Sequence, residues 1–542
     1  MDATDRERQR QRGAYYTPKV LADYLVDRTL GVGYEIGATV LDPACGDGAL
    51  LTAAAEQIWR RHSLDSKSSP PADRAAPLSA CLYGVDRDAG AIEQTNAALR
   101  SACGLTNPTV PVGRFVHGDA LLDASAGVAG ADLTLDWSAQ FPESERGFDF
   151  VVANPPFINI RRLTKRHDAG VKDWLRKRYR TARGCYDLYV LFIERALELL
   201  RPGGRCGLIA PNKLATMEYA EPCRRMLLEQ AKIVEIADTS TLRLFSADVY
   251  PYVIVFEKRA AQSDHRIRVL QPSADNELLD PPIVREVEQS SWTAATGFRV
   301  HGELAVEDRC PTAPLGDVAE LASGASGFTA QKVARMLADR KGEPREGEWD
   351  FVVSGNIDRF RLRRGGVRYM KSHYQRPVLR ENAEISNRKR QLYKSAKIIL
   401  AGMSKRLEAV YVADPLALGV QAYAVSVDHT AQGGDAYYLL ALLNSKLLSY
   451  LFSIRYRAKQ LSGGFLSINK RQLEQLPVRL VDDEQSVRLS DQIRNAAEVL
   501  QRPALDQRRR RELDGEIDRA VYELYGLTAD EIQQVERSVA AA

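Results

Sequence analysis

The sequence predicts a doubly wound α/β domain followed by an α+β domain and a helical tail. Three observations support this fold class. From residue 15 to about 258, short apolar runs alternate with stretches of helical periodicity, which is typical of a mostly parallel sheet covered by helices. Over 311–480, short β-like runs are mixed with many arginines. From residue 484 onward the pattern is helical and highly charged.

These patterns predict four regions: a first domain over 13–258, a connector over 259–310, a second domain over 311–480 and a helical segment over 484–542. Residues 63–77 (SLDSKSSPPADRAAP) are interpreted as a polar loop inserted in the sheet. Strands are expected at 39–41, 81–85, 148–153, 206–210, 233–237 and 252–256, and helices at 48–62, 89–99 and 188–200.

The composition is ordinary, with 45% apolar and 27% charged residues among 542, which excludes a disordered, collagen-like or coiled-coil protein. The seven cysteines form no C-x-x-C pair, so we expect neither a disulfide framework nor a metal site. No apolar run approaches the ~18 residues of a membrane helix, and the charged N-terminus is unlike a secretory signal. We expect a cytoplasmic protein without membrane contact.

A glycine turn follows the first expected strand in the sequence VLDPACGDGALL (40–51). Gly46 and Gly48 allow the backbone to approach a ligand closely, as in nucleotide-type cofactor sites at the carboxyl end of a first strand. The third glycine of G-x-G-x-x-G is missing, which disfavours NAD. Asp42, at the strand end, suits the amino group of a zwitterionic cofactor better than a pyrophosphate.

Two further acidic residues follow later strands. Asp86, in LYGVDRD, is positioned to bind two ribose hydroxyls, although its separation from Asp42 exceeds the usual ~20 residues and the polar loop accounts for much of the excess. Asp119, in HGDAL, can accept a hydrogen bond from an adenine amino group. Each acid alone is equally well explained as a helix N-cap or turn residue. Together, at successive strand ends, they predict a cofactor site.

The segment DFVVANPPF (149–157) places Asn-Pro-Pro-aromatic after a buried strand. The two prolines, Pro155 and Pro156, stiffen the loop and hold Asn154. The side-chain oxygen of Asn154 and the carbonyl of Pro155 can both accept hydrogen bonds from one –NH2 group, and Phe157 offers a face for stacking. A proline-rich turn alone would explain only the two prolines.

This order of motifs resembles that of gamma-class adenine-N6 DNA methyltransferases of the Taq type, with a C-terminal DNA-recognition domain. The resemblance implies a Rossmann-like domain that binds S-adenosylmethionine. It also implies that the upstream segment GAYYTP (13–18) contacts the methionine part of the cofactor. The residues that it assigns to the cofactor are Tyr16, Thr17, Pro18, Asp42, Ala44, Gly46, Gly48, Asp86, Arg87, Asp119, Ala120 and Asn154.

By the same resemblance, Asn154, Pro155, Pro156 and Phe157 are catalytic, and Phe245 stacks on the opposite face of the target base. Phe157 stands where tyrosine is commoner in the family, so stacking is kept and the hydroxyl contact is lost. Other weaker family matches, for which no role is assigned, are Tyr186, Asp187 and Lys213.

Positive charge is concentrated in the second domain. Between Arg359 and Arg406 there are fifteen Lys/Arg and two acids, interleaved with aromatic residues, whereas the whole chain has a net charge of +4. Such clustering is typical of phosphate binding, so double-stranded DNA is the partner expected for 311–480. A solvated basic surface is the alternative. The segments 354–358, 442–446 and 467–473 resemble the start and end of the family's recognition domain.

The sequence therefore predicts a site-specific DNA methyltransferase that transfers a methyl group from S-adenosylmethionine to N6 of a flipped-out adenine. A restriction-modification or other phage-defence system is the expected setting, with restriction or defence proteins as further partners. Methylation of RNA or of a protein glutamine is one alternative, and a non-catalytic DNA-binding subunit is another. A fused nuclease is not expected, because no P-D…(D/E)-x-K pattern is found and few residues precede the cofactor domain.

Overall fold

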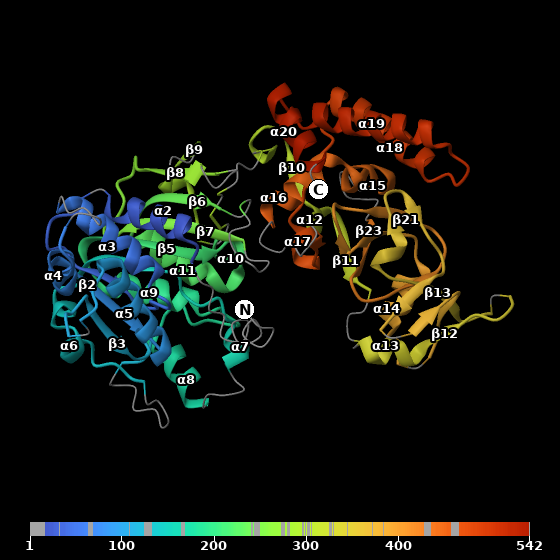
Figure 1. Ribbon diagram of the computed structural model, residues 1–542. Helices are drawn as coiled ribbons and strands as arrows, with labels where there is room; N and C mark the ends of the chain where they lie inside the picture. Colours follow the sequence, from blue (N-terminus) through green and yellow to red (C-terminus); the bar gives the residue numbers. More distant parts are fainter. Residues whose placement is uncertain are drawn as a thin grey trace. The chain divides into compact units, whose positions relative to one another are not determined.

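In the computed structural model the chain folds into two compact units, Met1–Gly302 and Glu303–Ala542 (Figure 1). The residues that the structure describes are 17–31, 33–62, 69–107, 109–123, 133–163, 169–239, 242, 250–272, 277–278, 282–294, 297–298, 300, 304, 306–324, 328, 330–343, 345–370, 372–382, 384–427, 435–456 and 465–540.

The first unit is built on a nine-stranded sheet with the strand order β3-β2-β1-β4-β5-β7-β6-β8-β9. Its strands are β1 (Val40–Asp42), β2 (Leu82–Asp86), β3 (Arg114–His117), β4 (Phe148–Ala153), β5 (Leu200–Pro211), β6 (Lys232–Asp238), β7 (Pro251–Glu257), β8 (Arg266–Leu270) and β9 (Ile283–Glu288). Its helices are α2 (Lys19–Leu30), α3 (Ala49–Arg61), α4 (Pro71–Cys81), α5 (Ala89–Cys103), α6 (Trp137–Gln140), α7 (Ile160–Leu163), α8 (Ala169–Arg178), α9 (Tyr189–Leu199), α10 (Lys213–Thr216) and α11 (Glu221–Gln230).

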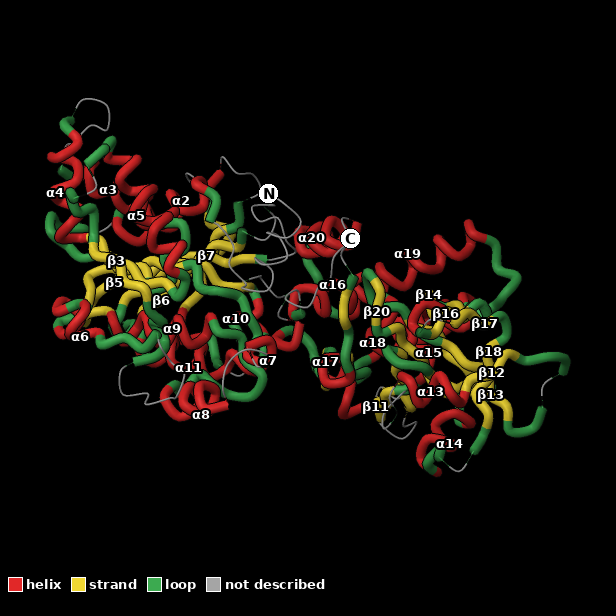
Figure 2. The backbone as a smooth tube through the Cα atoms, turned by 60° about the horizontal axis from the view of Figure 1, so that its bottom comes forward, coloured by secondary structure: helices red, strands yellow, loops and turns green. Residues whose placement is uncertain are grey.

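Helices cover both faces of this sheet, as Figure 2 shows for α2, α3, α4 and α5 on one side and α6, α9 and α11 on the other. The strands are apolar on both faces, so alternate residues enter two different cores. In β4, Phe150 and Val152 join the core with α2 and α3, whereas Val151 and Ala153 join the core with α9 and α11. The sequence predicts this arrangement because such strands appear as continuous apolar runs.

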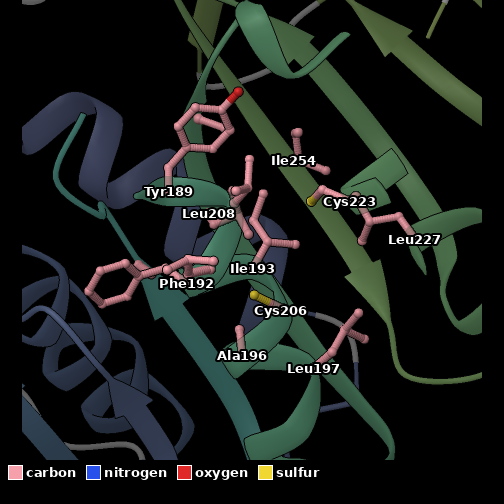
Figure 3. Close-up of a cluster of buried hydrophobic side chains, with 14 of the residues drawn as sticks. Tyr189, Phe192, Ile193, Ala196, Leu197, Cys206, Leu208, Cys223, Leu227 and Ile254 are labelled. Atoms are coloured by element: carbon pink, nitrogen blue, oxygen red, sulfur yellow. The ribbon is translucent and has the colours of Figure 1, made fainter. Parts of the chain in front are cut away.

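The longest apolar helix of the second face is α9, which presents aliphatic side chains to β5. Figure 3 shows Ile193 of α9 close to Leu208 of β5, with Cys223 of α11 beside them. All three side chains are at most 1% exposed. This packing anchors α9, which follows β4 in the chain after α7 and α8.

Parallel pairing joins β3, β2, β1, β4 and β5 in consecutive order. The register sets Leu41 beside Tyr83 and Val151, so the carboxyl ends of these strands lie along one edge. Strand β7 then runs antiparallel between β5 and β6. The "mostly parallel" expectation therefore holds for the half of the sheet that carries the predicted motifs.

Two expectations about this unit need correction. The expected polar loop at 63–77 contains the start of α4, because Pro71 occupies the first turn of a helix, where proline is tolerated. The expected connector at 259–310 instead contributes β8 and β9 to the sheet, and the boundary between the units lies at 302/303. The alternation of Arg266 to Leu270, with Ile267 and Val269 buried, is the signal that was missed.

The second unit contains several small sheets, the largest with the orders β11-β23-β19-β21 and β12-β18-β13-β22. Its strands are β10 (Thr312–Pro314), β11 (Ala319–Ser323), β12 (Leu337–Asp339), β13 (Glu348–Val352), β14 (Ile357–Asp358), β15 (Arg361–Leu362), β16 (Val367–Tyr369), β17 (Ser372–Tyr374), β18 (Pro377–Arg380), β19 (Lys397–Ala401), β20 (Met403–Ser404), β21 (Ala409–Val412), β22 (Leu416–Leu418), β23 (Ala422–Val427), β24 (Leu466–Ser467) and β25 (Pro477–Arg479). Its helices are α12 (Leu315–Val318), α13 (Ala330–Met336), α14 (Asn387–Lys394), α15 (Ala436–Asn444), α16 (Lys446–Arg455), α17 (Lys470–Glu474), α18 (Glu484–Leu500), α19 (Gln507–Leu524) and α20 (Ala529–Ala540).

Strand β19 separates the two cores of this unit. Ile398 and Leu400 pack with α15, α16 and the C-terminal helices, whereas Ile399 packs with the sheet that contains β13. The helices α18 and α19 thus complete a hydrophobic core of the second unit. The predicted fold class, an α/β domain followed by an α+β domain with a helical tail, is confirmed.

Within the described residues, no single helix is both long and apolar enough to cross a membrane. The consecutive helices α15 and α16, bent by 61°, meet the criterion together on length and composition alone.

The helix α2, which follows Thr17 and Pro18, is tied to the sheet through a buried carboxylate. Glu235 of β6 has a side chain that is 1% exposed; it accepts hydrogen bonds from Nε of Arg28 at 2.8 Å, from Nη2 of Arg268 at 3.0 Å and from the hydroxyl of Tyr24 at 3.2 Å. Both cations remain partly exposed, so the carboxylate carries most of the desolvation cost.

We expect Glu235→Gln to lower the free energy of unfolding by about 1.5–3 kcal/mol, because it weakens charge-assisted hydrogen bonds to two guanidinium groups that stay partly hydrated. Unfolding of the protein in urea, followed by fluorescence or circular dichroism, measures this loss. Glu288→Gln, which removes an exposed partner of Arg266, is the matched control and should change the free energy of unfolding by less than about 1 kcal/mol. Equal losses in the two variants would contradict the prediction.

Candidate active site

The turn after β1 has the conformation that its glycines predict. Gly46 and Gly48 have φ angles of +55° and +83°, in the left-handed region that favours glycine. A Cβ atom on Gly48 would also lie 3.0 Å from Cα of Thr95, so the turn is closed by a direct backbone approach. The amide of Ala44 donates a 2.9 Å hydrogen bond to Oδ1 of Asp42, which orients the carboxyl group at the strand end.

Asp42 is 1% exposed, and burial raises the pKa of its carboxyl to about 8. The hydrogen bond from Ala44 opposes this shift, whereas the nearby carboxylates of Asp86 and Asp47 add to it. Without a cation beside it, the group is therefore mostly protonated at neutral pH. A buried carboxyl of this kind fits a positively charged ligand group, whose arrival favours the ionised form.

The second and third acids lie at the same edge and contact their neighbours. Oδ2 of Asp86 accepts the N–H of Gly46 at 2.9 Å, so the end of β2 holds the glycine turn of β1. Nε of Arg87 forms a 3.2 Å ion pair with Oδ2 of Asp119, which lies after β3 and is followed by the buried Ala120. The cofactor residues expected after three separate strands therefore form one connected group.

Asn154 lies at the end of β4, next in order along the same edge. Its amide Nδ2 donates a 3.0 Å hydrogen bond to the hydroxyl of Thr17, which stands just before α2 with Pro18. This contact brings the segment before α2, expected to bind the cofactor, to the Asn-Pro-Pro loop. Pro155 is buried, and Pro156 and Phe157 are partly exposed.

A polar network supports the loop directly after Phe157. The carboxylate of Asp187 accepts hydrogen bonds from Nδ2 of Asn159 at 2.7 Å and from the hydroxyl of Tyr219 at 2.8 Å. Lys213 Nζ lies 3.8 Å from the same carboxylate. Backbone bonds between 158–160 and 186–188 add an antiparallel bridge.

The network reaches the aromatic ring of the motif. The hydroxyl of Tyr219 lies 3.2 Å from that of Tyr189, whose ring meets Phe157 edge to face at a centroid distance of 6.4 Å. Sequence reasoning singled out Asp187 and Lys213 without a role and missed Asn159, Tyr189 and Tyr219. The available signal was weak: Asn159 follows the motif by two residues, whereas Tyr219 lies far away in sequence. Tyr186, also singled out, is buried in the core.

Two expected site residues, Tyr16 and Phe245, lie outside the residues that the structure describes. The other residues expected after β1 to β4, together with Thr17 and Pro18, occupy one edge of the sheet. In the described part of the chain, no cluster of three or more His, Cys, Asp or Glu side chains has the arrangement of a metal site.

Several lysines and arginines of the basic segment 359–406 are buried or paired within the second unit. Lys397 is buried, and its Nζ donates to the carbonyls of Tyr393 and Ser395 at 3.1 and 2.7 Å. Burial lowers the pKa of Lys397 to about 8. Nη2 of Arg359 donates to Asp514 at 2.6 Å and to the carbonyl of Asn444 at 2.7 Å. Ion pairs with carboxylates also involve Arg363, Arg364, Arg380, Arg388, Arg390 and Lys394.

Comparison with protein families yields two matches. Residues 80–245 match the family described as "Eco57I restriction-modification methylase", and residues 353–478 match "TaqI-like C-terminal specificity domain". The first match spans β2 to β6, including the Asn-Pro-Pro-Phe loop, and the second spans β14 to β25.

Curated relatives match about half of the chain. The chain is 27% identical over 266 residues to the Type II methyltransferase M.BstVI of Geobacillus stearothermophilus, covering 48% of this chain and 44% of that protein. It is 26% identical over 258 residues to the Type II methyltransferase M.BanIII of Aneurinibacillus aneurinilyticus, covering 46% and 39%. The aligned part thus spans less than half the length of these relatives.

Among solved structures, the Type IIL restriction-modification enzyme MmeI, described in complex with DNA, matches with a TM-score of 0.58 and 12% identity, covering 100% of this chain and 80% of that one. At this identity the likeness concerns the fold alone. The family matches, to an Eco57I-type restriction-modification methylase over 80–245 and to a TaqI-like C-terminal specificity domain over 353–478, confirm the resemblance to Taq-type methylases with a C-terminal recognition domain.

Proposed function

We propose that this protein is a site-specific DNA methyltransferase that transfers a methyl group from S-adenosylmethionine to N6 of a flipped-out adenine. The observation that carries the proposal is the hydrogen-bonded arrangement of Asn154 and Thr17 at the sheet edge that also holds Asp42 and the glycine turn. The matched methylase and specificity domains support the same reaction class. The Type II methyltransferases among the relatives favour a restriction-modification system.

The residues at the edge fit this cofactor, which supplies an electrophilic methyl group on a sulfonium. Asp42 is a buried carboxyl that a cationic amino group would ionise. Asp86 would hold the ribose hydroxyls and Asp119 the adenine amino group, and the sharp turn at Gly46 gives the backbone a close approach. Thr17 and Pro18 would close the methionine end, next to Asn154.

At the other side of the site, Asn154 and the Pro155 carbonyl would accept hydrogen bonds from the exocyclic amine of the base. These acceptors favour a pyramidal nitrogen with an available lone pair, which an adenine amine otherwise delocalises into its ring. Direct transfer then depends mainly on positioning, and the proton leaves the nitrogen after the methyl has been transferred. No side chain of this site needs to form a covalent bond with the base.

Base flipping supplies the access that this geometry needs. Extruding a base costs a few kcal/mol, and stacking on an aromatic side chain returns about 1–3 kcal/mol. Phe157 would provide one such face, and its ring is held edge to face by Tyr189. Phe245 would provide the second face, as the family resemblance implies. The specificity domain would position the duplex and read its sequence.

The first test is methyl transfer from labelled S-adenosylmethionine to unmethylated bacterial genomic DNA. We expect label in N6-methyladenine and a loss of about 100-fold or more in Asn154→Ala, because the acceptor for the amine is removed. Asn107→Ala, which changes an exposed turn residue, is the matched control and should retain activity. Label in N4-methylcytosine would contradict the choice of base. No label on DNA, with tight cofactor binding, would contradict the reaction, and RNA would then be tested.

A second prediction concerns the release of a proton from Asp42 when the cofactor binds. Because the pKa of Asp42 is about 8 in the free protein, the group is mostly protonated at pH 7, and a cationic ligand that lowers this pKa releases the proton. Calorimetry of S-adenosylmethionine binding in two buffers of different ionisation enthalpy should therefore show proton release at pH 7. Release should shrink as the pH rises past 8. Asp42→Asn should abolish release and weaken binding, whereas Asp136→Asn, at an exposed helix cap, should do neither.

A third prediction concerns the network behind Phe157. Asp187→Asn should lower kcat for DNA methylation about 10-fold or more, because a small displacement of the reacting groups is costly. The dissociation constant of the cofactor should stay unchanged, since the carboxylate contacts the loop after the motif and none of the cofactor strand ends. Asp173→Asn, on an exposed position of α8, is the control. A fall in cofactor affinity equal to the fall in kcat would indicate general unfolding instead of loop positioning.

A further inference from the structure

In the structure, a few lysines and arginines of the basic segment 359–406 remain available to bind a ligand. Buried positions and carboxylate ion pairs account for most of its lysines and arginines. Arg368 is exposed, and it has no ion-pair partner among the residues that the structure describes. Arg376 is exposed as well, and its backbone N–H, rather than its guanidinium, is hydrogen-bonded to Asp339. Arg368 lies in a short hairpin, and Arg376 lies in the segment that follows this hairpin.

This hairpin is formed by β16 and β17, which pair in antiparallel register with Arg368 opposite His373. Val367 and Tyr369 point inward, where Tyr369 packs edge to face on Phe351 at a centroid distance of 5.4 Å. The alternate residues, Arg368 and His373, are therefore on the outer face and exposed.

The base of the hairpin is fixed by backbone bonds. The N–H of Gly366 donates to the carbonyl of Gln375 at 3.0 Å, and the N–H of Gln375 donates to Asp339 at 3.0 Å. A Cβ on Gly365 would lie 2.5 Å from the same Gln375 carbonyl, so the chain turns tightly there. These backbone bonds hold the base of the hairpin in place.

Met370 directly follows β16, at the tip of the hairpin. Its φ angle is +54°, in the left-handed region that glycine and asparagine adopt more readily than methionine. Its side chain is 52% exposed, more than that of any other large hydrophobic residue that the structure describes in this unit. This apolar side chain is therefore available for a contact outside the chain.

We propose that the hairpin formed by β16 and β17 enters the major groove of double-stranded DNA, with Met370 against the bases and Arg368 on the phosphates. This inference rests on the proposed function and names a contact surface for it. A two-stranded ribbon fits the major groove, where apolar side chains contact the thymine methyl group and thereby read sequence. Arginines beside the ribbon supply the phosphate contacts that set its register on the duplex. The cationic outer face and the apolar tip match these two tasks.

The variant Met370→Gly separates a role in DNA contact from a role in folding. Glycine adopts the left-handed conformation without cost, so the thermal midpoint of the variant should be unchanged or higher. Its affinity for a duplex of about 30 bp that carries the methylated site should fall about 10-fold, since a base contact is lost. Its affinity for a random-sequence duplex of the same length should not change. Fluorescence anisotropy on labelled duplexes measures both.

The double variant Arg368→Gln, Arg376→Gln tests the phosphate contacts. It should bind both duplexes more weakly and should reduce the slope of log K against log salt by about 2, because two phosphate contacts are lost. The matched control is Arg508→Gln on α19, which removes an exposed charge that lies outside the basic segment and is paired with Glu512. The control should keep the wild-type affinity and slope.

Wild-type affinities, site preference and salt slope in both hairpin variants would overturn the inference and leave the proposed function intact. A wild-type protein that binds DNA without transferring methyl groups would overturn the proposed function. The salt slope of the arginine variant on the random-sequence duplex would then still decide the phosphate contacts of the hairpin. A wild-type protein that binds neither duplex at any salt concentration would overturn both proposals.

Discussion

The parallel register of β2, β1 and β4 is the constraint on which the candidate site depends. Parallel strands bring their carboxyl ends to one edge, and here each of those ends carries a polar group within reach of its neighbour. The clearest sign is the bond from the Gly46 amide to Asp86, which joins the first two strand ends directly. A shift of one residue in this pairing would invert the faces of the strands and separate these groups.

Two other buried carboxylates, Glu235 and Asp187, support the site, and they differ in the charge of their hydrogen-bond partners. Glu235 is matched by two guanidinium groups and a hydroxyl, so it ties α2 to the sheet. Asp187 is matched chiefly by neutral donors, with Lys213 at the longer distance of 3.8 Å, and it braces the loop after Phe157. The first arrangement holds α2, which follows the Thr17 that contacts Asn154, and the second holds the loop after Phe157. The Asn-Pro-Pro loop thus contacts two anchored segments.

The sequence carries the first half of this architecture well, because apolar strands, a glycine turn and strand-end acids are local patterns. It predicts β1, β2, β4, β6 and β7 within one residue of their observed bounds and the second half of β5, and it puts Asp42 and Asn154 at strand ends. It does not reveal Tyr219 or Tyr189 as neighbours of the motif, because their contact depends on how α9 and α11 pack. The number of lysines and arginines in the basic segment is also misleading. Lys397 is buried and donates hydrogen bonds to carbonyls, and Arg359 binds Asp514, so neither charge is available to a ligand.

The burial of Asp42 also links the lifetime of the polypeptide to the supply of a small molecule. A carboxyl whose pKa is raised to about 8 in the folded chain destabilises the folded state by an amount that grows as the pH rises from about 4 and is complete above about pH 8. A ligand that binds only the folded state, and that supplies the missing cation, offsets this penalty and adds its own mass-action stabilisation. Proteases act on transiently opened chains, so the ligand-free form is degraded faster. The amount of protein in a cell would then follow the concentration of its cofactor.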